Sequence, residues 1–236
     1  MREFILNILF PKRCVNCGAY GKYICDNCFV SIRYLDFSKC TECMKPSVTS
    51  LTHKRCRKRY GLDGLFAAVE YRTVIKKAVY KYKYEPYIYS LSGILSRLMH
   101  EFYIQNEALQ NILSASSNVW ITCVPLHENR LKIRGYNQSA MLGKILSEKM
   151  NLPFNSKIIK RVRDTIPQFK LSKEERIKNI ADAFQLNSRY KGKMRGKTIL
   201  LVDDVFTSGS TMRECGKLLK KSGAKAVYGL VLAMEQ

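Results

Sequence analysis

The chain has 236 residues, and its 46% of hydrophobic residues is ordinary for a folded protein, which argues against general disorder. Its 41 Lys and Arg outnumber 19 Asp and Glu, giving a formal net charge of +22 at pH 7. This excess favours polyanionic partners such as nucleic acid or phosphorylated ligands, although a Lys-rich genome would leave the same bias.

The start of the chain gives no sign of export or membrane insertion. Arg2–Phe10 is apolar but too short for a secretory signal, and it lacks a small-residue cleavage site. No apolar run reaches the length of a membrane-spanning helix. We therefore expect a cytoplasmic protein without a membrane span, in which Arg2–Phe10 forms a short helix on the folded body. Cysteines in that compartment indicate metal rather than disulfides.

Residues 1–60 contain seven of the nine Cys, six of them in three C-x-x-C pairs. Two-residue spacing lets both sulfurs reach one ion, and thiolates suit tetrahedral Zn²⁺. The first two pairs predict a Cys₄ site, and the third pair with a following H-x-x-C predicts a Cys₃His site. The predicted ligands are Cys14, Cys17, Cys25 and Cys28 for the first site, and Cys40, Cys43, His53 and Cys56 for the second.

We expect residues 1–60 to form a small zinc-ribbon domain that depends on metal for stability, because large apolar residues are few. Two alternatives remain open: His53 is an ordinary surface residue beside a degenerate second site, or the knuckles pair in an interleaved order. The basic tail Lys54–Arg59 fits either contact with nucleic acid or docking on the chain's own second domain.

Residues 61–236 are expected to form an α/β domain after a linker or turn at Gly61–Gly64. Predicted strands and helices alternate along the chain, which indicates a doubly wound, mostly parallel sheet. The predicted strands are Leu65–Tyr71, Val119–Pro125, Lys157–Arg163, Ile199–Val202 and Lys225–Met234. The predicted helices are Arg72–Tyr84, Tyr89–Gln105, Asn137–Met150, Ser172–Ala181 and Met212–Lys221.

One face of the predicted helix Arg72–Tyr84 carries Lys residues interleaved with Tyr. Such a face can stack bases and neutralise the phosphates of a single strand. It is more typical, however, of a solvated Lys face whose Tyr rings cover the edge of the core.

The stretch Ile199–Thr211 combines a buried strand, two acids, a loop of small residues and a helix start. A small-residue loop lets backbone N–H groups approach a phosphate, and the helix N-terminus favours an anion. Asp203 and Asp204 would repel that phosphate, so ribose hydroxyls or a divalent cation are their sensible partners. The stretch predicts a pocket for a ribose 5-phosphate. The alternative is a plain buried strand before a helix capped by Asp204 or Ser208.

A second loop, Leu126–Gln138, is expected to leave the same edge of the sheet, where ligands of open α/β sheets bind. It contains Arg130, Lys132 and Arg134, which can meet a pyrophosphate.

The stretch Ile199–Thr211 resembles the signature of type I phosphoribosyltransferases. By that resemblance, Asp203 and Asp204 would hold the ribose hydroxyls of phosphoribosyl pyrophosphate (PRPP). The loop residues that would wrap its 5-phosphate are Thr207, Ser208, Gly209, Ser210 and Thr211. An active enzyme would displace pyrophosphate by a nitrogen nucleophile, with Mg²⁺ and Arg130 or Arg134 stabilising the leaving group. No general base is evident: Thr207 replaces the Asp of the purine-salvage branch, and His127 is the alternative.

Three stretches together resemble the bacterial competence protein F (ComF) family. They are the Cys-rich start, the run VPLHENRLKIRGYNQ, and the spaced set Arg161, Thr165, Gln168, Leu171, Arg176 and Asn179. The resemblance implies a zinc ribbon fused to a phosphoribosyltransferase domain. It also implies handling of single-stranded DNA in natural transformation, with helicase or recombination proteins as partners, and a looser link to DNA repair. His53 departs from the pattern, since a fourth C-x-x-C would be expected there.

The sequence therefore leaves three alternative functions. The chain binds PRPP with Mg²⁺ together with single-stranded DNA, or it is an active transferase of unknown acceptor, or it is a zinc-stabilised scaffold with a vestigial pocket. Intact acids and an intact loop argue against the last.

Overall fold

The computed structural model describes residues 11–164, 180 and 182–235. The predicted helices Arg2–Phe10 and Ser172–Ala181 therefore lie almost wholly outside the described residues. The same holds for the spaced set from Thr165 to Asn179. Within the described part, no helix combines the length and apolar character needed to cross a bilayer.

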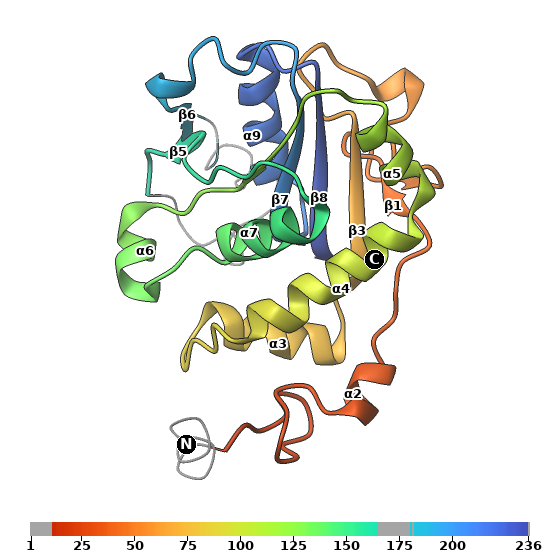
Figure 1. Ribbon diagram of the computed structural model, residues 1–236, viewed down its shortest axis with the longest axis vertical. Coiled ribbons are helices and arrows are strands. Elements are labelled where there is room, and N and C mark those ends of the chain that lie inside the picture. Colours follow the sequence, from red (N-terminus) through yellow and green to blue (C-terminus); the bar gives the residue numbers. More distant parts are fainter. Residues whose placement is uncertain (1–10, 165–179, 181, 236) are drawn as a thin grey trace.

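A four-stranded sheet forms the centre of the molecule, and all its neighbouring strands run parallel (Figure 1). The order across the sheet is β3, β8, β7, β4. Their bounds are Gly64–Glu70 for β3, Val119–Cys123 for β4, Thr198–Phe206 for β7 and Ala226–Met234 for β8. The predicted α/β fold with a mostly parallel sheet is confirmed.

Helices cover both faces of the sheet, with α4 and α7 packed on one face and α9 on the other. Figure 1 shows α4 and α7 crossing the near face. The helices are α3 (Thr73–Lys83), α4 (Leu91–Gln105), α5 (Glu107–Ser114), α6 (Glu128–Arg134), α7 (Gln138–Met150) and α9 (Ser210–Lys221).

The sheet separates two hydrophobic cores. Leu200 and Val202 of β7 point into the core beneath α4 and α7, whereas Ile199 and Leu201 point into the core beneath α9. Successive strand side chains face opposite sides. A strand buried on both faces is therefore apolar at every position, which explains the unbroken run in the sequence.

Both outer edges of the sheet are covered by irregular chain. Along β3, Tyr34 forms an antiparallel bridge with Val69, and Leu51 forms one with Gly64. Along β4, the amide of Ile121 donates to Pro153, and the amide of Asn155 donates back to Ile121. These segments pair backbone groups that an open edge would expose.

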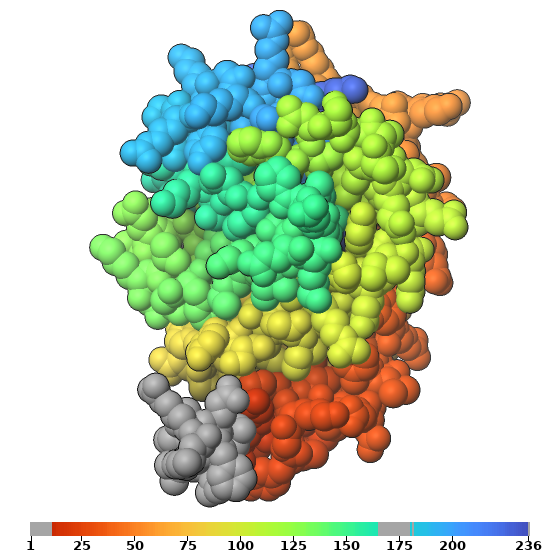
Figure 2. All heavy atoms as spheres, viewed as in Figure 1, coloured from red at the N-terminus to blue at the C-terminus, as the bar shows by residue number. Residues whose placement is uncertain are grey.

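The N-terminal region forms two lobes, each built around one cluster of cysteines. The first lobe holds the helix α2 (Asp26–Val30), and the second holds the strands β1 (Ser38–Lys39) and β2 (Pro46–Ser47) with the 3₁₀ turn η1 (Lys54–Cys56). Figure 2 shows the first lobe, in red, at one end of the molecule beside α3 and α4.

Three expectations need correction. The stretch Leu126–Gln138 is not a loop throughout, because it contains helix α6. The third predicted strand shortens to β5 (Ile159–Arg161), which pairs antiparallel with β6 (Phe184–Leu186) outside the main sheet. Strand β7 continues past Val202 to Phe206, so the two acids lie within the strand rather than after its end. A further 3₁₀ turn, η3, spans Ser188–Tyr190.

Candidate functional site

A cavity of about 460 Å³ opens where β4 and β7 end, and both acids line it. Its volume falls in the range of ordinary small-molecule sites. The predicted ligand residues around it are Asp203, Asp204, Thr207, Thr211, Arg130 and Arg134. The structure thus brings together, at one edge of the sheet, residues that are far apart in the sequence.

Two hydrogen bonds hold one carboxylate oxygen of Asp203. The hydroxyl of Ser139, at the start of α7, donates to Asp203 Oδ1 at 2.7 Å, and the amide of Asp204 donates to the same oxygen at 2.9 Å. Burial, together with the negative charge of Asp204, raises the pKa of Asp203 to about 7, against the opposing effects of Lys83 and Ser139. Asp203 therefore changes charge near neutral pH.

Asp204 is buried and forms an ion pair with Lys83 from the end of α3. The distance between Lys83 Nζ and Asp204 Oδ1 is 2.7 Å. Burial alone would lower the pKa of the Lys83 ammonium, but the charges of Asp204 and Asp203 outweigh it and raise that pKa. The pair keeps Asp204 as an acceptor facing the cavity and places a cation beside the spot where a ligand anion would lie.

The signature loop, Thr207–Thr211, connects β7 to α9. Gly209 has φ of +71° and directly precedes the first residue of α9. A side chain at Gly209 would meet the ring of Phe206 at 2.3 Å, so only glycine fits. A small hollow of about 30 Å³ is lined by Thr207, Gly209, Ser210 and Thr211, among others. An anion in this hollow would face the N-terminus of α9.

Ser208 differs from the other loop residues, because it does not line the hollow. Its hydroxyl lies 3.1 Å from the hydroxyl of Ser210, and its carbonyl accepts a hydrogen bond from Arg213. Ser208 therefore contacts Ser210 inside the loop and Arg213 on α9, rather than the hollow.

Arg130 and Arg134 are presented by α6, between the N-cap residue His127 and the C-cap residue Gly135. Burial lowers the pKa of Arg134, with Asp204 opposing the effect. His127 lies in a neighbouring cleft, with Nδ1 at 3.5 Å from Asp164 Oδ2. This position does not place His127 on the cavity that holds the two acids.

Two tyrosines of α3 and its C-cap form the outer rim of the cavity. The ring centroids of Tyr80 and Tyr84 are 5.1 Å apart, and the guanidinium carbon of Arg134 lies 5.6 Å from the Tyr84 centroid. Tyr80 is 56% exposed and Tyr84 is 39% exposed, so both rings remain accessible. The rim therefore offers aromatic surface next to cationic groups.

Sequence reasoning missed Lys83 and Ser139 as site residues. Lys76, Val79, Tyr80 and Lys83 follow helical spacing along one face of α3, and all four line the cavity. The signal for Lys83 was its position four residues after the buried Val79, at the border between the apolar stripe and the solvated face. Nothing in the sequence around Ser139 marks it.

The first cysteine cluster consists of Cys14, Cys17, Cys25 and Cys28, whose sulfur atoms lie within 4.8 Å of one another. Zn–S bonds of about 2.3 Å in a tetrahedron place sulfurs about 3.8 Å apart. Cys17 Sγ and Cys25 Sγ are 3.6 Å apart, which fits such a tetrahedron. None of the chain's cysteines forms a disulfide.

The second cluster consists of Cys40, Cys43, His53 and Cys56, and its ligand atoms satisfy the same distance limit. Cys43 Sγ lies 3.4 Å from His53 Nδ1, while His53 Nε2 lies 3.0 Å from the carbonyl of Pro46. A carbonyl only accepts, so Nε2 donates and Nδ1 presents its lone pair to the cluster, as in histidine–zinc sites. The donor set fits structural zinc, and the two clusters are not interleaved.

Family models match both parts of the chain. The model described as double zinc ribbon domain matches residues 5–57, and the model described as phosphoribosyl transferase domain matches residues 137–235. The chain therefore carries a double zinc ribbon ahead of a phosphoribosyltransferase domain.

Curated relatives match much of the chain. The DNA utilization protein YhgH of Escherichia coli K12 is 30% identical over 218 residues, covering 89% of this chain and 88% of the relative. The YhgH protein of Salmonella typhimurium is 31% identical over 212 residues. Competence protein F of Haemophilus influenzae is 41% identical over 112 residues, a match that covers 47% of this chain and 48% of that protein. On the two-domain organisation and these relatives together, the chain belongs to the competence protein F (ComF) family.

Proposed function

We propose that the chain binds PRPP with Mg²⁺ in the cavity at the end of β7 and handles single-stranded DNA in DNA uptake or repair. The observation that carries the first part is the pair of acids on the cavity wall beside a glycine-dependent loop at a helix N-terminus. Asp203 and Asp204 would accept from ribose hydroxyls, and the signature loop would hold the 5-phosphate.

Cations beside the acids would complete the site. Lys83, Arg130 and Arg134 line the same cavity and would face the pyrophosphate. Mg²⁺ bound with PRPP would neutralise part of the pyrophosphate charge. We assign none of the protein's own side chains as a ligand of this Mg²⁺.

Calorimetric titration with PRPP and Mg²⁺ tests this site directly. The Asp203→Asn and Asp204→Asn variants should weaken binding at least about tenfold, because each loses an acceptor for a ribose hydroxyl. Glu107→Gln, at the start of α5 away from the cavity lining, is a matched control. Equal affinity in all four proteins would overturn the assignment.

The second part concerns DNA, and the rim of the cavity supports it. The accessible rings of Tyr80 and Tyr84 lie beside Arg134 and Lys76. Base stacking on aromatic rings together with phosphate neutralisation is typical of single-strand binding. The names of the relatives, competence protein F and DNA utilization protein, agree with a role of this kind.

Fluorescence anisotropy with a labelled oligonucleotide tests the rim. Replacing both rim tyrosines by Ala should weaken binding about tenfold or more, and affinity should fall steeply with salt. Tyr20→Ala, at a 64% exposed ring in the first lobe, is the control. If Tyr20→Ala alone weakens binding, DNA lies on the first lobe instead, and flat affinity across salt would reject DNA binding.

The alternative function is catalysis. A nitrogen acceptor would form a bond to ribose C1 as the bond from C1 to pyrophosphate breaks, with pyrophosphate leaving and the acceptor losing its proton. Asp203, Asp204 and Arg134 would be the residues in contact with substrate. Release of labelled pyrophosphate from PRPP, dependent on an added base, would favour this reading over binding alone.

A further inference from the structure

One arginine connects the second cysteine cluster to the signature loop. Arg213 lies on α9, one turn after Gly209, and its amide donates to the Gly209 carbonyl. Its Nη1 donates to the carbonyl of Thr41 at 2.7 Å, and its Nη2 donates to the carbonyl of Ser208 at 2.7 Å. A single planar guanidinium therefore spans two backbone segments that are 167 residues apart in sequence.

Each end of this bridge belongs to a tightly defined turn. Thr41 lies inside the Cys40-x-x-Cys43 knuckle, where the amide of Met44 donates to the carbonyl of Cys40. At the other end, a side chain added at Gly209 would meet both Phe206 and the Nη1 of Arg213. The signature loop is thus confined between the Phe206 ring and the Arg213 guanidinium.

The knuckle takes its shape from the metal that its cysteines are built to hold, because two thiolates on one ion fix the turn between them. If that turn relaxes, Arg213 loses its acceptors there, which are the Thr41 carbonyl and the more distant Met44 sulfur at 3.9 Å. The Ser208 carbonyl then still accepts from Arg213, but the Arg213 side chain is no longer held in place from its other end. The first cluster makes no such contact with the loop among the described residues.

We propose that Arg213 is a positioning residue that ties the second cluster to the signature loop, so that metal in this cluster strengthens phosphate binding at the loop. This inference rests on the proposed PRPP site and deepens it. Arg213 need not touch the ligand, because it acts through the Ser208 carbonyl and the backbone that follows. By linkage, ligand at the loop must also raise the affinity of the second cluster for metal by the same factor.

The test uses the zinc-loaded full-length chain and two readouts. Calorimetry should show that Arg213→Ala weakens PRPP binding about tenfold, a coupling of ordinary size. Arg213→Lys should not rescue it, because an ammonium cannot span two carbonyls as a guanidinium does. Lys217→Ala, one turn further along α9 and exposed, is the matched control and should bind normally.

The second readout is the equilibrium partition of zinc between the chain and a chromogenic chelator. In the Cys17→Ser background, in which the first cluster is disabled, PRPP should reduce the fraction of zinc that the chelator takes from the second cluster. Adding Arg213→Ala should abolish that protection. A merely structural role would change the basal partition of zinc but not its response to PRPP. Protection that survives Arg213→Ala, or unchanged PRPP affinity in that variant, would overturn the inference.

Failure of the proposed PRPP site can be told apart from failure of the bridge. If the zinc-loaded wild-type chain binds no PRPP, the site assignment fails on its own. The bridge is then tested by amide hydrogen exchange of Thr207–Thr211. Exchange should quicken in Cys43→Ser and in Arg213→Ala, with no further increase when both changes are combined. Additive increases, or none, would reject the bridge.

Discussion

The two cysteine lobes have the same kind of donor set but are attached to the rest of the chain in different ways. The first lobe meets the phosphoribosyltransferase domain through side chains: Lys77 donates to the carbonyl of Asn16, and Arg97 lies over the ring of Phe29. The second lobe is joined through its backbone. Leu65 of β3 donates to the carbonyl of Ser50, and Thr52 donates to that of Asp63.

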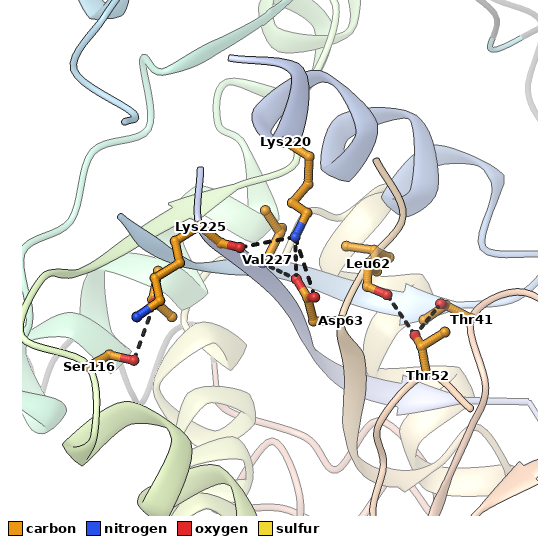
Figure 3. A network of polar contacts seen from close by, with 9 residues as sticks. Thr41, Thr52, Leu62, Asp63, Ser116, Lys220, Lys225 and Val227 are labelled. Atoms are coloured by element: carbon orange, nitrogen blue, oxygen red, sulfur yellow. Dashed lines mark hydrogen bonds and ion pairs between the residues drawn. The ribbon is translucent and has the colours of Figure 1, made fainter. Parts of the chain in front are cut away.

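Buried polar contacts strengthen this second attachment. The Thr52 hydroxyl donates to the carbonyl of Leu62 at 2.6 Å and accepts from the Thr41 hydroxyl, as Figure 3 shows. Figure 3 also shows the ion pair between Lys220 of α9 and Asp63, the residue directly after Leu62. The difference teaches that the first lobe is attached by side-chain packing, with Ile24 and Cys28 in the core beneath α4 and α7, whereas the second is also tied to β3 by backbone hydrogen bonds.

The largest expected effect comes from disabling one cluster at a time. Cys43→Ser should lower the midpoint of the main thermal transition by roughly 10 °C or more, because metal binding at the second lobe supports the domain directly. Cys17→Ser should leave that midpoint nearly unchanged and remove zinc from the first lobe only. Calorimetric scans with zinc analysis measure both, and equal shifts would break the comparison.

Removing one buried hydroxyl tests the attachment of the second lobe alone. Thr52→Val leaves the Leu62 carbonyl and the Thr41 hydroxyl without their partner, which should cost about 1–3 kcal/mol of unfolding free energy. Urea denaturation measures this cost. The exposed Thr49→Val in the same lobe is the control and should change little. A loss below about 0.5 kcal/mol would mean that this contact does not fasten the second lobe.

The response of the cavity to pH should depend on Asp203 and not on the first lobe. The pKa of Asp203 is about 7, so the carboxylate is mostly protonated at pH 6 and mostly ionised at pH 8. PRPP affinity should therefore rise about tenfold over that interval. Only the ionised carboxylate of Asp203 can accept hydrogen bonds from ribose hydroxyls and also attract a nearby cation such as Lys83. Titrations of wild type, Asp203→Asn and Cys17→Ser measure this rise.

PRPP itself titrates in the same interval, so the difference between wild type and Asp203→Asn is the informative quantity. Asp203→Asn should flatten the rise, whereas Cys17→Ser should keep it. A slope shared by wild type and Asp203→Asn would show that the ligand alone titrates.

The smallest effect is expected at the side-chain contacts of the first lobe. Lys77→Ala removes the exposed hydrogen bond to the Asn16 carbonyl at 3.0 Å and should cost less than about 0.5 kcal/mol. Denaturation curves compared with Lys81→Ala, elsewhere on the same helix, measure it. A cost comparable to that of Thr52→Val would show that the first lobe is held as firmly as the second.

Elements with a strong hydrophobic pattern could be predicted from the sequence, and those without one could not. The strand Ile199–Val202 and the helix beginning at Asn137 were found because burial dictates their composition. Helix α6 was missed because it has no buried residue, and its Ile133 is 73% exposed. Without an apolar stripe, only its caps, His127 and Gly135, mark its ends.

The candidate site shows the same division. The acids and the signature loop are contiguous in sequence, so their grouping could be predicted from spacing alone. The Lys83–Asp204 pair joins residues from two separate elements, and only the packing of α3 against the end of β7 reveals it. Arg213 was unmarked for a similar reason, since its two acceptors at 2.7 Å are backbone carbonyls, which no sequence pattern displays.

The covered sheet edges limit how copies of this chain can associate. Tyr34 and Leu51 occupy hydrogen-bonding positions along β3, while Pro153 and Asn155 do so along β4. A neighbouring molecule cannot readily add a strand to a border whose backbone groups already have partners. A complex formed at these two edges of the main sheet should therefore rely on side-chain contacts. The net charge of +22 should favour acidic partners there over further copies of the chain.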